Sequence, residues 1–77
     1  MERDLVEYIA KSLVDDPAGV SVNEVDTDEA TVIELRVSQD DIGKVIGKRG
    51  RIAKAIRTLL SAAATRGGKD VRLSILD

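Results

Sequence analysis

The chain has 77 residues, a net charge of −2, and neither cysteine nor histidine. We expect one domain (residues 1–77) without a disulfide, a Cys/His zinc site, a cofactor or a Cys- or His-based nucleophile–base pair. Residues 1–41 carry three basic and twelve acidic side chains, whereas residues 42–77 carry nine basic and two acidic ones. Basic residues gathered in one half predict a surface that faces a polyanion.

A helix is predicted over residues 3–14, because apolar residues recur there at helical spacing. Leu5, Ile9 and Leu13 form the expected core-facing line, and Val6, Tyr8 and Ala10 widen it. The run Asp15-Asp16-Pro17 should end this helix, since proline has no backbone N–H and disfavours helical geometry in the residue before it. The charged start of the chain and the lack of ~20 consecutive apolar residues predict neither a signal peptide nor a membrane-spanning segment.

Two strands are predicted next, over residues 20–25 and 31–37, where polar and apolar side chains alternate. The polar segment 26–29 between them is short enough for an antiparallel hairpin. Ile33 and Leu35 share one face of the second strand. The alternation alone does not decide whether that face lies in the core or at the edge of a ligand groove.

Two helices and a third strand complete the predicted order. Ser38 is placed to act as the N-cap of a helix that ends at Gly47. A longer helix over residues 51–65 has an amphipathic pattern. Its predicted apolar stripe consists of Ile52, Ala55, Ile56, Leu59, Leu60 and Ala63. Arg66-Gly67-Gly68 should end this helix in a glycine cap, and residues 71–76 alternate as a strand.

This element order predicts an α+β domain, with helices packed on one face of a three-stranded mixed sheet. The hairpin makes the first two strands antiparallel. The second and third strands should be parallel, because the pair of helices between them is a crossover connection.

The turn between the last two predicted helices concentrates the functional signals. Gly47 and Gly50 let the backbone turn sharply and come close to a ligand. Lys48 and Arg49 stand between them. Arg51 then begins a helix whose first N–H groups and positive dipole end can bind a phosphate. Together these features predict a site for a phosphodiester backbone, and the alternative is an ordinary turn with solvated charges.

The run Val45-Ile46-Gly47-Lys48-Arg49-Gly50-Arg51-Ile52 resembles the signature of KH domains, although Ile52 follows Gly50 by two residues rather than three. The element order is similar to the type II KH fold, and the whole chain resembles the small stand-alone bacterial RNA-binding proteins of the KhpA family. That resemblance implies cytoplasmic, non-catalytic binding of single-stranded RNA, with the GxxG loop clamping the sugar–phosphate backbone. It also implies a role as an RNA chaperone or post-transcriptional regulator.

The resemblance further implies a set of RNA-binding residues around this loop. They are Gly47, Lys48, Arg49, Gly50, Arg51, Ile46, Lys44, Ile42, Val45 and Lys54. Bases would lie over an apolar groove with residues 42–46 on one side and strand residues such as Ile33 and Leu35 on the other. The implied partners are a second copy of the chain, or a larger protein with KH and R3H domains, and neither a membrane nor a small-molecule substrate. We expect that interface on the exposed side of the helix over residues 51–65.

Two other interpretations remain open. The helix over residues 51–65 could read duplex DNA as part of a helix-turn-helix, although it lacks the Asn and Gln side chains that read base edges well. The chain could instead be a protein-interaction module whose helices dock a partner. The single aromatic residue, Tyr8, is far from the loop in sequence, so we expect little base stacking on aromatic rings. Enzyme activity is not expected, and the glycine spacing from Gly43 to Gly47 does not fit a P-loop.

Overall fold

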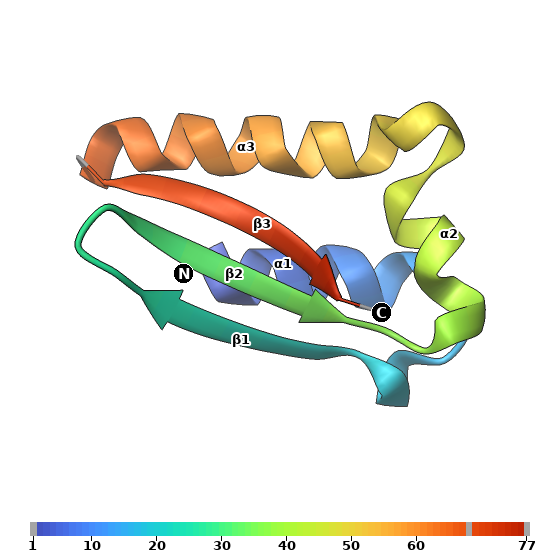
Figure 1. Ribbon diagram of the computed structural model, residues 1–77. Helices are drawn as coiled ribbons and strands as arrows, with labels where there is room; N and C mark the ends of the chain where they lie inside the picture. Colours follow the sequence, from blue (N-terminus) through green and yellow to red (C-terminus); the bar gives the residue numbers. More distant parts are fainter. Residues whose placement is uncertain (1, 68, 77) are drawn as a thin grey trace.

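The computed structural model describes residues 2–67 and 69–76. Three helices and three strands follow one another in the predicted order (Figure 1). They are α1 (Glu2–Leu13), β1 (Ser21–Asp26), β2 (Ala30–Arg36), α2 (Ile42–Ile46), α3 (Arg51–Gly67) and β3 (Asp70–Leu76). Three short 3-10 turns connect them, at Pro17–Gly19, Gln39–Asp41 and Lys48–Gly50.

The sheet is mixed, as predicted. β1 pairs antiparallel with β2, from Ser21 opposite Arg36 to Asp26 opposite Thr31. β2 pairs parallel with β3, so β2 is the central strand and β1 and β3 are the edges. The parallel pair needs the long crossover through α2 and α3, because no tight turn can join parallel neighbours.

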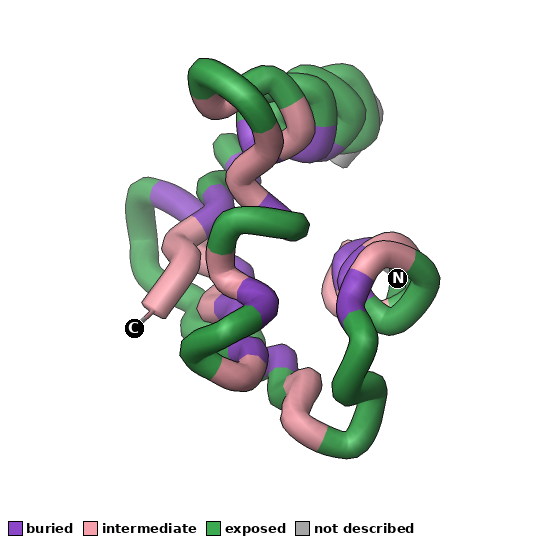
Figure 2. Tube along the Cα trace, turned by 90° about the vertical axis from the view of Figure 1, so that its right-hand side faces the viewer, coloured by how far each residue is buried: buried purple, intermediate pink, exposed green. Residues whose placement is uncertain are grey.

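One face of this sheet carries the core. Ile33 and Leu35 of β2 are fully buried there, with Val71 and Leu73 of β3 beside them. α1 and α3 lie on this face, and in the end-on view of Figure 2 the buried segments of helices and sheet face a shared interior. The alternation of β2 therefore places Ile33 and Leu35 in the core, the first of the two positions left open by the sequence.

The predicted apolar stripe of α1 was correct for Val6 and Ala10 but wrong for Leu5 and Tyr8, which are exposed. The residues of this helix that are buried against the sheet are Val6 and Ala10, whereas Leu5 is 39% exposed. The core-facing line thus runs one position further along the helix than the predicted line of Leu5, Ile9 and Leu13. Small and β-branched side chains on that line let the helix lie close to the sheet, while the longer leucines flank the contact.

In α3, too, the buried face differs from the predicted one, and apolar residues are left exposed. Its buried residues include Ile56 and Leu60, as predicted. Ala55, Leu59 and Ala63 were predicted to be in the core, but all three are exposed, Leu59 by 51%. α3 also continues to Gly67, and the Gly68 of the predicted cap lies outside the described residues. We call Ala55, Leu59 and Ala63 the outer row of α3.

The segment before α2 differs from a regular capped helix. Ser38 stands at the N-cap position of the 3-10 turn, but its side chain makes no capping hydrogen bond. Its hydroxyl instead donates to Asp16 Oδ2, 2.6 Å away, and so ties this segment to the end of α1. No helix in the described ranges 2–67 and 69–76 is long and apolar enough to cross a membrane.

Candidate nucleic-acid interface

The turn between α2 and α3 is tight and left-handed. Gly47 has φ 78°, Arg49 φ 58° and Gly50 φ 73°. The Gly47 N–H donates to the Gly43 carbonyl at 2.9 Å, and the Gly50 N–H donates to the Gly47 carbonyl at 3.0 Å. These two hydrogen bonds hold the turn in one shape before any ligand is present.

The two glycines of the turn are required for different reasons. A Cβ on Gly47 would lie 2.6 Å from Cγ1 of Ile52, so both the positive φ and the packing demand glycine there. A Cβ on Gly50 would meet no atom within 4 Å, so only its positive φ demands glycine. Gly47 therefore fixes the turn against α3, and Gly50 keeps its outer surface bare.

Cationic side chains surround this turn. Lys48 and Arg49 are exposed at its tip, Arg51 is exposed at the first position of α3, and Lys54 follows one turn later. None of the four side chains forms an ion pair with another described residue. The acidic tip of the β1–β2 hairpin lies at the opposite end of the molecule (Figure 1). The loop therefore offers unneutralised positive charge beside the positive end of a 17-residue helix.

Lys44 does not belong to this group of free cations. Its Nζ lies 2.6 Å from Asp15 Oδ2 and 3.1 Å from Asp41 Oδ1, which hold it toward the end of α1. Hydrogen bonds to Asp15 and Asp41 raise the pKa of Lys44 above its ordinary value. The structure thus places Lys44 in an ion-paired cluster rather than at the loop.

The Asp41 carboxylate is the centre of that cluster. It is buried, and it accepts the backbone N–H groups of Asp15 at 3.3 Å and Asp16 at 3.1 Å. Burial by itself raises the pKa of Asp41, but the hydrogen bonds from Lys44 and from these two amides outweigh it and hold the pKa below the ordinary aspartate value. Asp41 therefore fastens the start of α2 to the segment that follows α1, and this contact helps to fix the orientation of α2 and of the loop after it.

The apolar residues predicted for the site differ in how far they are buried. Val45 is fully buried in the core, so its side chain has no surface to offer a ligand. Ile42 and Ile46 are partly exposed, and Ile42 packs against the edge of the core. The predicted groove with Ile33 and Leu35 on its far side is not present, because both side chains are fully buried under the helices.

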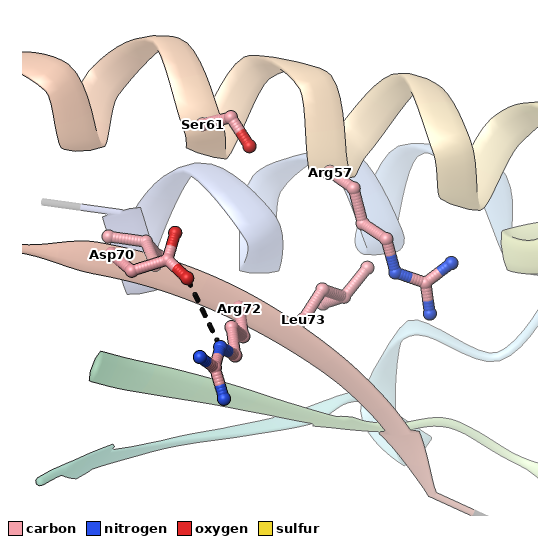
Figure 3. Close-up of a pocket in the computed structure, with 6 residues that line it drawn as sticks. Arg57, Ser61, Asp70, Arg72 and Leu73 are labelled. Carbon is pink, nitrogen blue, oxygen red and sulfur yellow. Dashed lines mark hydrogen bonds and ion pairs between the residues drawn. The ribbon is translucent and has the colours of Figure 1, made fainter. Parts of the chain in front are cut away.

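A different groove lies between α3 and the edge strand β3. It has a volume of about 340 Å³ and is lined by Arg57 and Ser61 of α3 and by β3 residues Asp70, Val71, Arg72 and Leu73. In Figure 3 the Arg57 side chain descends from α3 beside Leu73, while Arg72 turns toward Asp70. Arg72 Nε donates to Asp70 Oδ2 at 3.1 Å. The groove therefore has an apolar floor at Leu73 with the Arg57 guanidinium beside it, whereas the Arg72 guanidinium lies on the side of β3 that faces away from α3 (Figure 3).

The loop and the fold can be compared with those of known protein families. The family model described as "KhpA/KhpB, KH domain" matches residues 3–75. The chain belongs to this KH-domain family. Its mixed sheet and helix order are those of the type II KH fold, which confirms the resemblance noted in the sequence.

Several curated relatives of this KH domain match it over nearly their whole length. The RNA-binding protein KhpA of Clostridium perfringens is 58% identical over 74 residues, covering 96% of this chain and 99% of the relative. KhpA of Borreliella burgdorferi is 54% identical over 76 residues, covering 99% and 93%. KhpA of Treponema pallidum is 48% identical over 77 residues, covering 100% and 96%. No solved structure gives a significant match.

The sequence missed the groove residues of this KH domain. Arg57 and Ser61, which line the groove, were not among the predicted site residues. They continue at helical spacing from Lys54, which was predicted, and we call Lys54, Arg57 and Ser61 the groove row of α3. That spacing was visible in the sequence. The position of Arg72 was not, because only the strand order places β3, rather than β2, at the edge beside α3.

Proposed function

We propose that this KH domain binds single-stranded RNA without catalysis, with phosphate groups seated on residues 47–50. One observation carries the proposal. The left-handed turn at Gly47, Arg49 and Gly50 puts two free cations and bare backbone at the start of α3. Backbone N–H groups at a helix start and a positive dipole end favour phosphate, and neighbouring cations add attraction for the next phosphates of the strand.

The groove between α3 and β3 supports a single strand rather than a duplex. The groove lies between a helix and the edge of a sheet, so bases must leave a stack to enter it. Arg57 lies beside its apolar floor at Leu73, and Arg72 lines the groove from β3, where its guanidinium is paired with Asp70. Arginine guanidinium planes can stack on bases, which offsets the lack of aromatic rings near the loop. The free edge of β3 can also hydrogen-bond the base edges of a single strand.

The family supports the choice of RNA as the nucleic acid. The relatives that match nearly the whole chain carry the name RNA-binding protein KhpA. Contacts to phosphate position a strand but carry no sequence information, so one domain should bind RNA with little sequence preference. Such binding suits an RNA chaperone or post-transcriptional regulator, and we propose that the protein acts in the cytoplasm together with its RNA targets.

Titration with RNA tests this function and maps the surface at the same time. We expect a short single-stranded RNA of mixed sequence to be retained in a gel-shift assay more strongly than duplex DNA. In ¹H–¹⁵N spectra, the amide shifts should change at residues 47–51 and along the groove, at Arg57 and Arg72. Stronger retention of duplex DNA, or shift changes confined to other surfaces, would contradict the proposal.

We also propose that the chain self-associates through the outer row of α3. Exposed Leu59 between the small residues Ala55 and Ala63 gives this flank an apolar centre that a second helix can approach closely. A domain of this size gains stability from pairing, and two linked sites raise weak RNA affinity. The family description names KhpA and KhpB together, which supports a heterodimer with a larger KH/R3H protein through the same flank.

Leu59→Glu should abolish self-association, because it puts a charge at the centre of the apolar contact. Leu59 is half exposed in one chain, so the monomer fold should remain intact. Sedimentation velocity at tens of micromolar, a range in which weak dimers form, measures the outcome. Ser12→Glu, at another exposed helix position but on α1, serves as the control. An unchanged dimer with Leu59→Glu would place the interface elsewhere.

A further inference from the structure

The outer side of β1 is a free edge of the sheet. β1 pairs with β2 on its other side only, so alternate residues of β1 direct their backbone N–H and C=O groups outward. The Thr27 N–H donates to the Ala30 carbonyl at 2.9 Å and so continues the ladder with β2 at odd-numbered positions. Arg3 Nε donates to the Val22 carbonyl at 3.0 Å from the opposite side. The even-numbered residues of β1 therefore face outward.

Arg3 closes only one end of this edge. It comes from α1, and its hydrogen bond takes up the carbonyl of Val22. By the same alternation the backbone groups of Glu24 and Asp26 point outward, and the described residues offer these groups no partner. Unpaired backbone groups at a sheet edge are a template for another extended segment. The open part of the edge thus runs from Glu24 toward the hairpin tip.

The charge around the open edge selects the kind of segment that fits it. Residues 20–34 contain five acidic side chains and no basic one. Lys69 Nζ pairs with Asp26 Oδ1 at 2.6 Å, whereas no described residue forms an ion pair with Glu24. Acidic surroundings repel RNA and anionic lipids, and pairing with β1 of a second copy would bring like charges together. A basic segment of another protein suits this edge.

The side chains of β1 add a second requirement. Glu24 and Asp26 lie on one face of the strand, and Val25 lies between them on the other. Val25 is 38% exposed and stands opposite Val32 of β2, on the face of the sheet that carries no helix. Directly opposite residues of paired strands have their Cβ atoms about 5 Å apart on the same face. An added strand is therefore complementary when basic and apolar residues alternate in it.

We propose that the outer edge of β1 binds an extended segment of another protein, in which basic and apolar residues alternate, as a fourth strand of the sheet. This inference goes beyond RNA binding and uses no residue of the loop. The β1–β2 turn and the loop between α2 and α3 lie at opposite ends of the molecule (Figure 1). Both ligands can therefore be bound at once, and the chain can join an RNA to a basic protein.

A fluorescein-labelled nonapeptide of alternating lysine and valine is the probe. The comparison peptide carries a methyl group on every backbone nitrogen, which keeps the charges and removes the donors. By fluorescence anisotropy the unmodified peptide should bind at least about tenfold more tightly. In ¹H–¹⁵N spectra its binding should slow hydrogen exchange at the amides of Glu24 and Asp26. The amides of Asn23 and Val25, which already face β2, should change less.

A pair of substitutions separates charge at this edge from charge elsewhere on the protein. Glu24→Gln keeps the strand and should weaken binding of the unmodified peptide about threefold, since one cross-strand ion pair is lost. Asp40→Asn removes one negative charge as well, but at an exposed position in the turn before α2. It should leave peptide binding unchanged. Neither substitution should alter RNA binding.

Three outcomes would overturn the proposal. Equal binding of the two peptides would show that charge alone attracts them. Equal loss in Glu24→Gln and Asp40→Asn, or exchange protection confined to residues outside β1, would remove the edge as the binding surface. No detectable binding of the unmodified peptide at about 1 mM would remove the interaction itself. In each case the proposed RNA-binding function stands, because its own titration is measured separately.

Discussion

Replacing both Lys48 and Arg49 with aspartate is expected to remove most RNA binding and leave the fold intact. The double substitution reverses two exposed charges that have no partner among the described residues. Aspartate suits this turn, because it tolerates the left-handed conformation that Arg49 adopts with φ 58°. We expect affinity for single-stranded RNA to fall by about 100-fold or more at moderate salt, since attraction to the phosphates becomes repulsion.

The salt dependence of binding gives this prediction a second measurement. Each phosphate contact contributes about 0.7 to the slope of log affinity against log salt for single strands, so two lost contacts reduce the slope by about 1.4. Fluorescence anisotropy at several salt concentrations provides both values. The control is Lys11→Glu with Arg36→Glu, which changes net charge equally but lies on α1 and β2. Equal losses in the two variants would mean that overall charge, and not this loop, governs binding.

The largest effect on stability is expected for Gly47→Ala. Alanine at position 47 would have to keep the positive φ of the glycine. Its Cβ would lie 2.6 Å from Cγ1 of Ile52, whose side chain packs against the core. Strain and overpacking together should cost about 2–4 kcal/mol of unfolding free energy. That is a large part of the total on the order of 5 kcal/mol expected for so small a domain.

Gly50→Ala is the matched comparison, because the two glycines share a positive φ and differ in packing. A Cβ at Gly50 meets no neighbour, so only the cost of the left-handed conformation remains, about 1–2 kcal/mol. Urea denaturation followed by far-UV circular dichroism measures both values. Equal destabilisation by the two substitutions would show that the contact with Ile52 has no energetic weight.

Local features of the sequence predicted the loop and the order of the elements. The left-handed turn at Gly47 and Gly50 and the hairpin between β1 and β2 each depend on residues that are neighbours in the chain. Their local sequences therefore predict them. The cluster of Lys44 with Asp15 and Asp41 could not be predicted in this way. Lys44 and Asp15 are 29 positions apart, and their contact exists only because α1 ends beside the start of α2.

The faces of the helices were harder to predict than the helices themselves. In α3, apolar residues outnumber the positions that the sheet can cover, so the pattern fits two rotations of the helix. The structure selects the one that buries Ile56 and Leu60 and exposes Leu59. Likewise, the groove required knowledge of which strand lies at the edge. Strand order is a property of the whole fold. The predicted groove had Ile33 of β2 on its far side, whereas the observed groove is lined by residues of β3, among them Arg72.

The placement of the two rows on α3 has a consequence for RNA held by a pair of chains. The groove row of Lys54, Arg57 and Ser61 and the outer row around Leu59 lie on opposite flanks of the same helix. Pairing through the outer row, as proposed above, would therefore leave both grooves open. Such a pair can hold two separate strands, or two distant stretches of one strand, within a few nanometres. It would then raise the encounter rate of complementary sequences without reading either one.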